Sequence, residues 1–134
     1  MDKLTPVQRS ELMSRIRAKD TTPEMIVRRL AHGLGFRYRL HVSTLPGKPD
    51  LVFPSRQKVI FIHGCYWHRH RCRKGKSLPA THQEFWVEKF KNNVKRDRQH
   101  NKMLVAAGWE TLVIWECETK DIQALKSVLL NFLG

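Results

Sequence analysis

A chain of 134 residues is long enough for a single hydrophobic core, and we expect one domain over residues 1–134. Lysine and arginine number 25 against 12 aspartates and glutamates, and this net charge of +13 favours a polyanionic partner such as nucleic acid. No apolar run follows the N-terminus and no stretch approaches the ~18 apolar residues of a membrane span, so we expect a cytoplasmic protein without a membrane partner.

Two helices should open the chain. Thr5 as a cap and Pro6 in the first turn predict a helix that runs to about residue 18. The sequence Thr-Pro-Glu at 22–24 begins a second helix, which should end near Gly33 or Gly35.

Three strands should follow these helices. Residues 36–42 alternate apolar and basic side chains, which is typical of a half-buried strand. After a loop at 45–49, residues 50–53 predict a short strand, and the β-branched residues of 58–63 predict a buried one.

The second half should return to alternating elements. The basic segment 64–79 is irregular, a long helix should run from residue 83 to about 107, and 109–115 should form a further strand. An amphipathic helix over about 121–132 closes the chain. The element order ααβββαβα predicts an α/β domain with a central mixed sheet flanked by helices.

The segment 63–72 is the richest in potential metal ligands. Cys65, His70 and Cys72, with Cys117 after the last strand, make a Cys₃His set. Such a set suits structural zinc, because four protein ligands complete its tetrahedron. The alternative is that each cysteine is a small buried hydrophobe, which Cys117 alone would favour.

A carboxylate and two histidines should meet at one rim of the sheet. Asp50 starts one strand, His63 ends the next, and His68 lies in the loop that follows. A carboxylate can hold Mg²⁺ and a histidine can deprotonate an attacking water, so the group suits metal-assisted phosphodiester hydrolysis. The simpler alternatives are a turn aspartate after Pro49 and a histidine that hydrogen-bonds the backbone.

The long helix carries one inward stripe at spacings of three and four. Its members are Trp86, Phe90, Val94, Asp97, Asn101 and Leu104. Asn93 and Asp97 lie near or on its inward edge, either as buried hydrogen-bonding groups or as water-mediated partners of a metal.

Aromatic side chains lie beside positive charge in the basic segment. Tyr66 and Trp67 precede a run that contains no acid, and Trp86 begins the next helix. We expect Arg71 and Lys74 to contact phosphates, and the aromatics to stack on bases or wedge between them. The alternative is a hydrophobic cluster that covers the zinc, and for Trp86 this alternative stays open.

Several blocks between about residues 10 and 117 carry a family resemblance. They are LPGKPD at 45–50, VIFIHGCYWH at 59–68, PAT at 79–81, EFW at 84–86, KNNV at 91–94, RDR at 96–98 and WEC at 115–117. In this order they resemble the very-short-patch repair (Vsr-type) DNA mismatch endonuclease family. The resemblance implies a restriction-endonuclease-like fold and a magnesium-dependent enzyme that nicks duplex DNA 5′ of the thymine in a T·G mismatch, which arises from deamination of 5-methylcytosine.

The resemblance also implies roles for single residues. Asp50 and the backbone carbonyl of Ile62 would hold Mg²⁺, and Glu24 would support the histidine site. His68 would be the general base and His63 would assist at the phosphate. The implied zinc ligands are Cys65, His70, Cys72 and Cys117. The expected DNA contacts are Met13, Tyr66, Trp67, Trp86, Asn93, Arg71 and Lys74.

The chain departs from the wider fold at 61–63. Many nucleases of this fold carry a second acid and a lysine there, so a histidine mechanism must replace them. Ile62 stands where better-known members have threonine, which leaves a role for the carbonyl and removes one for a hydroxyl.

We therefore expect a monomer that acts on double-stranded DNA at the bacterial nucleoid, with the helical segment 5–20 contacting DNA. Mismatch-repair proteins and an associated cytosine-5 methyltransferase system are the other expected partners. Two alternatives remain: a restriction-type nuclease of the same fold that cuts both strands, and a non-catalytic zinc-stabilised DNA-binding module. The second has no need for Asp50, His63 and His68 together.

Overall fold

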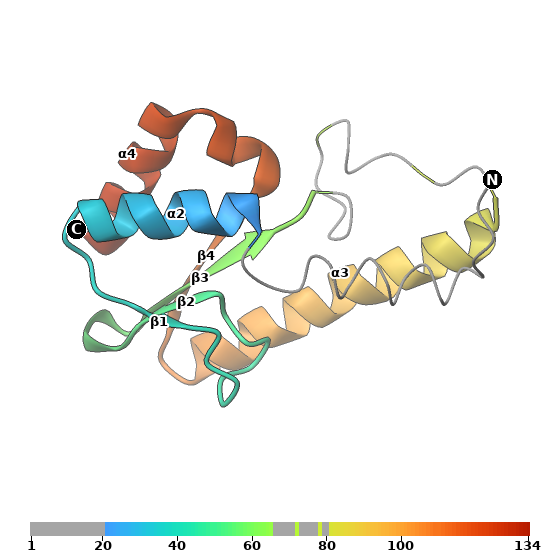
Figure 1. Ribbon diagram of the computed structural model, residues 1–134. Helices are drawn as coiled ribbons and strands as arrows, with labels where there is room; N and C mark the ends of the chain where they lie inside the picture. Colours follow the sequence, from blue (N-terminus) through green and yellow to red (C-terminus); the bar gives the residue numbers. More distant parts are fainter. Residues whose placement is uncertain (1–20, 66–71, 73–77, 79–80) are drawn as a thin grey trace.

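The computed structural model describes residues 21–65, 72, 78 and 81–134, and it has helices on both faces of a four-stranded sheet (Figure 1). Helices α2 (Thr22–Gly33) and α4 (Ile122–Leu133) cover one face, and α3 (Gln83–Ala106) covers the other. The predicted α/β class with a mixed sheet flanked by helices is confirmed. The helix predicted at 5–18 lies outside the described residues. Within them, no helix is long and apolar enough to cross a membrane.

The sheet brings three chain segments to one end. Its strands lie in the order β1 (Arg39–Leu40), β2 (Leu51–Phe53), β3 (Lys58–His63) and β4 (Glu110–Trp115). The first three are antiparallel neighbours, whereas β4 runs parallel to β3 after the crossover through α3. The start of β2 and the ends of β3 and β4 therefore share one end, called here the carboxyl end of the sheet.

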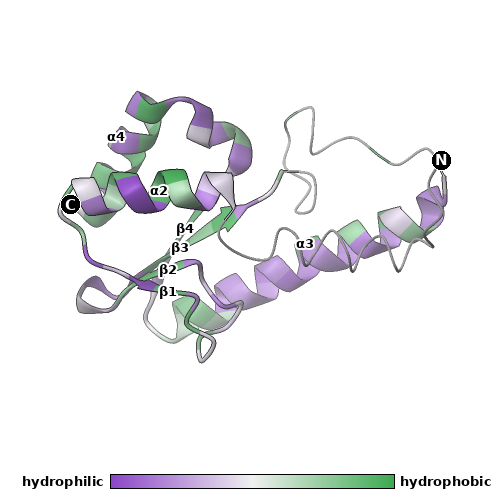
Figure 2. Ribbon diagram, viewed as in Figure 1, coloured by the Kyte–Doolittle hydropathy of each residue, from purple (hydrophilic) through white to green (hydrophobic). Residues whose placement is uncertain are grey.

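Both faces of the central strands β2 and β3 are largely buried. Ile60 packs in the cluster shared with α2 and α4, and Val59 packs in the cluster shared with Leu104 of α3. Successive side chains of a strand point to opposite faces, so Ile62 lies on the α2 face while Phe61 and His63 lie on the α3 face. The hydropathy colouring shows β3 as apolar, and it shows an α3 that is hydrophilic along most of its length (Figure 2).

Local signals explain where α2 begins and ends. The Thr21 hydroxyl accepts a hydrogen bond from the Glu24 backbone N–H at 3.4 Å, and a proline occupies the first turn. The helix ends before Gly35, whose φ of +94° suits a residue without a side chain. These bounds agree with the prediction, and they place Glu24 in the first turn with only 3% of its surface exposed.

The α3 helix follows the predicted stripe at its apolar positions. Trp86, Phe90 and Leu104 are buried, and Gly108, with φ of +91°, follows the end of the helix. Asp97 is half-buried. Asn101, in contrast, is exposed and accepts a hydrogen bond from the Thr111 hydroxyl of β4.

The predicted strand at 36–42 is mostly wrong. Only Arg39 and Leu40 form β1, an edge strand that pairs with Val52 and Leu51 of β2. Phe36 is buried in the core, but Leu40 is 42% exposed instead of facing it. The strand stops at His41, whose φ of +47° is left-handed. The sequence also did not predict the 3₁₀ helix Glu116–Lys120 that joins β4 to α4.

Candidate functional site

The carboxyl end of the sheet gathers residues that are distant in sequence. Asp50 directly precedes β2, and His63 is the last residue of β3. Cys65 follows β3, and Cys117 follows β4 in the first turn of the 3₁₀ helix. The predicted meeting of the Asp50 and His63 strand ends is therefore present in the topology.

Asp50 is fixed by the backbone of the neighbouring strand. Its Oδ2 accepts a hydrogen bond from the Ile62 N–H at 2.7 Å, two residues beyond Ile60, which pairs with Leu51. The N–H and C=O of one strand residue point to the same side, so the Ile62 carbonyl also faces the side on which Asp50 lies. A carboxylate and a carbonyl are hard oxygen donors of the kind that Mg²⁺ prefers, so these two residues fit that ion.

The surroundings of Asp50 act strongly on its pKa. Burial is the largest influence, and with the negative charge of nearby Glu24 it raises the pKa of Asp50 from 3.8 to about 7. The Ile62 hydrogen bond and the Arg28 charge oppose this shift. A cation bound at Asp50 would favour the ionised carboxylate, so metal binding and proton release should be linked at this residue.

A buried ion pair stands beside Asp50. Arg28 Nη2 lies 2.6 Å from Glu24 Oε2, one helical turn away on α2. The same Nη2 lies 3.0 Å from His41 Nε2. The Arg28 and Glu24 side chains are only 10% and 3% exposed. Glu24, which the sequence assigned to support the histidine site, is here held by Arg28.

His41 connects this ion pair to Asp50. Its backbone N–H donates to the Asp50 carbonyl at 3.3 Å, and its Nδ1 lies 3.8 Å from Asp50 Oδ1. Its Nε2 lies 3.4 Å from Glu24 Oε2. Glu24, His41 and Asp50 each offer one ligand atom within 4.8 Å of the others. The sequence prediction missed both Arg28 and His41.

His63 lies at the same end of the sheet as Asp50, on the α3 face. His63 is 8% exposed, with its ring centroid 5.6 Å from that of Phe61 and 5.2 Å from that of Trp115. Packing by these rings limits the orientations open to the imidazole.

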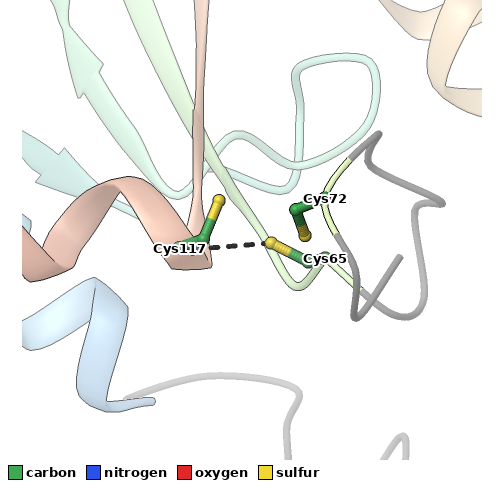
Figure 3. A group of neighbouring side chains, drawn as sticks. All are labelled: Cys65, Cys72 and Cys117. Carbon is green, nitrogen blue, oxygen red and sulfur yellow. Dashed lines mark hydrogen bonds between the residues drawn. The ribbon is translucent and has the colours of Figure 1, made fainter. Parts of the chain in front are cut away.

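Three cysteines form a second group at the carboxyl end. Cys65 at the end of β3 and Cys72 of the following loop lie side by side, and Cys117 approaches from the 3₁₀ helix (Figure 3). Their sulfurs all lie within 4.8 Å of one another, and the Cys117 backbone N–H donates to Cys65 Sγ at 3.4 Å. Sulfurs on a tetrahedral zinc with bonds of ~2.3 Å lie roughly 3.8 Å apart, so the triad fits zinc.

The environment of the three cysteines also changes the pKa of Cys65. Burial, with a smaller effect of the neighbouring thiols, raises the pKa of Cys65 to about 12. A coordinating thiol is deprotonated by its metal, so the same position would hold a thiolate once an ion binds. The fourth predicted zinc ligand, His70, lies outside the described residues.

The expected DNA contacts are only partly described. Trp86 is 3% exposed and packs against Phe85 and Phe90, with ring centroids 5.2 and 5.8 Å away. Trp86 therefore packs in a hydrophobic cluster, and whether that cluster covers the zinc ligands stays a prediction. Asn93 is half-buried and accepts a hydrogen bond from Arg96 Nη2 at 2.9 Å. The structure does not describe Met13, Tyr66, Trp67, His68, Arg71 and Lys74.

Comparison with known proteins is specific. The family model of the DNA mismatch endonuclease Vsr matches residues 1–74. A type II nicking enzyme, V.XorIIP of Xanthomonas oryzae pv. oryzae, is 47% identical over 132 residues, which cover 98% of this chain and 96% of the relative. The DNA mismatch endonuclease Vsr of Escherichia coli is 42% identical over 123 residues, covering 92% of this chain and 78% of the relative. The type II nicking enzyme V.NmeAIP of Neisseria meningitidis is 41% identical, covering 90% and 85%.

Proposed function

The chain belongs to the family of the DNA mismatch endonuclease Vsr, and on this premise we propose that it nicks duplex DNA 5′ of the thymine in a T·G mismatch. As a member of this family it is a DNA-nicking endonuclease. The choice of mismatch, which would come from deamination of 5-methylcytosine, belongs to the proposal. The restriction-endonuclease-like fold and the cofactors, Mg²⁺ and Zn²⁺, are also part of the proposal.

The position of Asp50 carries the proposal. Asp50 and the Ile62 carbonyl would hold Mg²⁺, which when bound stabilises negative charge on the scissile phosphate. The 2.7 Å hydrogen bond from the Ile62 N–H to Oδ2 fixes the carboxylate rotamer and leaves lone pairs on both oxygens. A carboxylate that did no more than cap a turn would not need to be buried beside Glu24.

The histidines supply the proton chemistry. His68 would take a proton from the attacking water, and His63 would donate a hydrogen bond to a phosphate oxygen. His63 suits this role because it lies at the same end of the sheet as Asp50, and because Phe61 and Trp115 restrain its ring. Glu24 would act indirectly, through the electrostatics around Asp50.

Zinc would position the loop that carries His68. Cys65, His70, Cys72 and Cys117 form the proposed ligand set, and the described triad is compatible with it. The ligands Cys65 and Cys72 flank residues 66–71, whereas Cys117 belongs to the sheet side of the site. Zinc would thus tie the loop to the ends of β3 and β4.

DNA binding would draw on the +13 charge and on aromatic insertion. Tyr66 and Trp67 would insert beside the mismatch, Arg71 and Lys74 would contact phosphates, and Met13 would enter from the segment 5–20. Trp86 and Asn93 would join them, but Trp86 must first leave its cluster with Phe85 and Phe90. Cutting one strand needs one active site, so a monomer suffices. Mismatch-repair proteins and a cytosine-5 methyltransferase system would be its associates.

The test is strand cleavage on matched substrates. The wild type should nick one strand of a T·G duplex in Mg²⁺ and leave a T·A duplex intact. Asp50→Ala and His68→Ala should abolish nicking and keep most DNA affinity, whereas Glu110→Ala, at an exposed acid, should nick normally. Wild-type cleavage of both strands, or nicking by Asp50→Ala at the wild-type rate, would contradict the proposal.

A further inference from the structure

Arg28 places a permanent positive charge beside the proposed magnesium site. It belongs to the middle of α2, is 8% exposed, and its backbone carbonyl accepts a hydrogen bond from the Tyr38 hydroxyl at 3.3 Å. Its Nη2 touches both Glu24 Oε2, at 2.6 Å, and His41 Nε2, at 3.0 Å. The proposed nicking chemistry assigns no step to this side chain.

The groups around Arg28 resemble a metal site of a different kind. Glu24, His41 and Asp50 bring two carboxylates and one imidazole within 4.8 Å. Mixed imidazole and carboxylate donors suit transition metals such as Mn²⁺ or Zn²⁺. Mg²⁺ prefers oxygen donors alone, which Asp50 can supply together with the Ile62 carbonyl.

The guanidinium takes the atoms that such a transition metal would need. A guanidinium only donates hydrogen bonds, so the 3.0 Å contact uses the lone pair of His41 Nε2. It also occupies Glu24 Oε2, and it cannot lose its charge in a protein. A divalent ion placed among the three ligands would meet a like charge at close range in a buried region, where screening is weak.

We propose that Arg28 keeps divalent ions out of a nitrogen-containing metal site formed by Glu24, His41 and Asp50. The divalent ion is thereby confined to the oxygen donors at Asp50. This inference rests on the proposed role of Asp50 as the magnesium ligand. Arg28 is then a specificity-determining residue, which selects against ions that bind imidazole. His41 is a positioning residue, held by Arg28 on one side and joined to Asp50 on the other.

The test measures metal binding without DNA, on zinc-loaded protein. Arg28→Met keeps the apolar stem, and Arg28→Gln keeps an N–H donor for Glu24, so that one folded variant is available if the other is unstable. Mn²⁺ is titrated and the free ion is counted by electron paramagnetic resonance. Spin-echo modulation of the bound ion reports coupling to a histidine nitrogen. We expect either variant to bind Mn²⁺ about tenfold more tightly than the wild type, because the opposing charge is gone.

Three controls assign the effect. The wild type should bind Mn²⁺ without histidine-nitrogen coupling, the Arg28 variants should gain it, and adding His41→Ala to either variant should remove it. Arg29→Gln, the loss of the same charge one residue along at an exposed position, should change neither quantity. The variants should also nick more slowly in Mn²⁺ than in Mg²⁺, relative to the wild type, since the new site moves the ion away from its working position.

Two results would overturn the inference. One is a folded Arg28 variant that gains no nitrogen coupling. The other is a wild type that already shows a coupling abolished by His41→Ala. Failure of the proposed function looks different: Asp50→Ala would then bind Mn²⁺ as the wild type does, or the wild type would not nick in Mg²⁺.

Discussion

Burial and hydrogen bonding act in opposite directions on the Asp50 carboxyl group. The protein removes it from water, which favours the protonated form, and supplies the Ile62 N–H and the Arg28 charge, which favour the ionised form. Burial dominates, and the resulting pKa of about 7 places the group near the midpoint of its titration at neutral pH. A bound cation would then decide the charge of the site.

This pKa predicts a pH-dependent stability in magnesium-free buffer. Between pH 3.8 and about 7 the folded protein holds a proton on Asp50 that the unfolded chain has released. The contribution to stability is therefore complete below about pH 4 and is lost as the pH rises through 7. Asp50→Asn cannot ionise, so it should unfold at a higher denaturant concentration than the wild type at pH 8. The gain in its free energy of unfolding should be about a few kcal/mol at most.

The measurement is urea unfolding of both proteins at pH 5 and pH 8. Stability of the wild type should fall more than that of Asp50→Asn between the two. Glu110→Gln, at an acid with 70% of its side chain exposed, is the control and should follow the wild type. Parallel pH profiles for Asp50→Asn and the wild type would contradict the raised pKa.

Single site residues differed in how far the sequence revealed them. Asp50 and the cysteines stood out because rare residue types occur at strand ends or at short spacings. Arg28 was missed, although it lies four residues after Glu24 on one helix and this spacing would have been enough to suggest the ion pair. His41 gave no such signal, because its position depends on a left-handed backbone at the end of β1.

At the scale of elements, local chemistry fixed some boundaries and neighbours fixed others. Capping by Thr21 and the glycine that follows α3 act within a few residues, so the bounds of both helices followed from sequence. The length of β1 instead depends on its pairing with β2 and on the left-handed backbone of His41 that ends it. An alternating pattern carries no information about that partner, and the strand was predicted too long.

The loop before β2 packs against α3 and thereby helps to place Asp50. Gly47 has φ of +75°, and a Cβ at this position would lie 2.9 Å from Nδ1 of His100 in α3. The loop therefore packs its backbone directly against α3. Because Asp50 follows three residues later, the placement of α3 also constrains the carboxylate.

Zinc should join elements that the hydrophobic core does not. The wild type should contain about one zinc per chain. Cys72→Ser removes a ligand from the loop side of the triad and should lower this zinc content. Because binding of structural zinc contributes directly to folding, the melting temperature should fall by about 10 °C or more. Cys72→His keeps a ligand atom and is the matched control, which should retain more zinc. The checks are elemental analysis and thermal unfolding, and a stable, active wild type without zinc would contradict the assignment.

At the scale of the whole molecule, charge was readable from sequence and topology was not. Composition alone gives +13, whatever the fold. The strand order and the parallel pairing of β3 with β4 depend on contacts between residues about fifty positions apart, for which no local propensity exists. The structure adds that α3 is hydrophilic along most of its length, with exposed Lys91, Lys95 and Lys102 (Figure 2).

Affinity for DNA and preference for the mismatch should therefore be separable by mutation. Lys95→Ala removes one exposed charge and should weaken T·G and T·A duplexes equally. If Lys95 neutralises one phosphate, the slope of log affinity against log salt should become shallower by about 0.9.

Trp67→Ala should leave that slope unchanged and should reduce the preference for T·G by about tenfold to a hundredfold, since stacking on a base is worth about 1–3 kcal/mol. A wobble pair is easier to unstack than a matched pair, so an inserted ring selects it through deformation. The measurement is equilibrium binding of both duplexes over a salt series, in Ca²⁺ to prevent cleavage. Equal weakening of both duplexes by Trp67→Ala would mean that the indole only packs within its loop, and that the mismatch is recognised elsewhere.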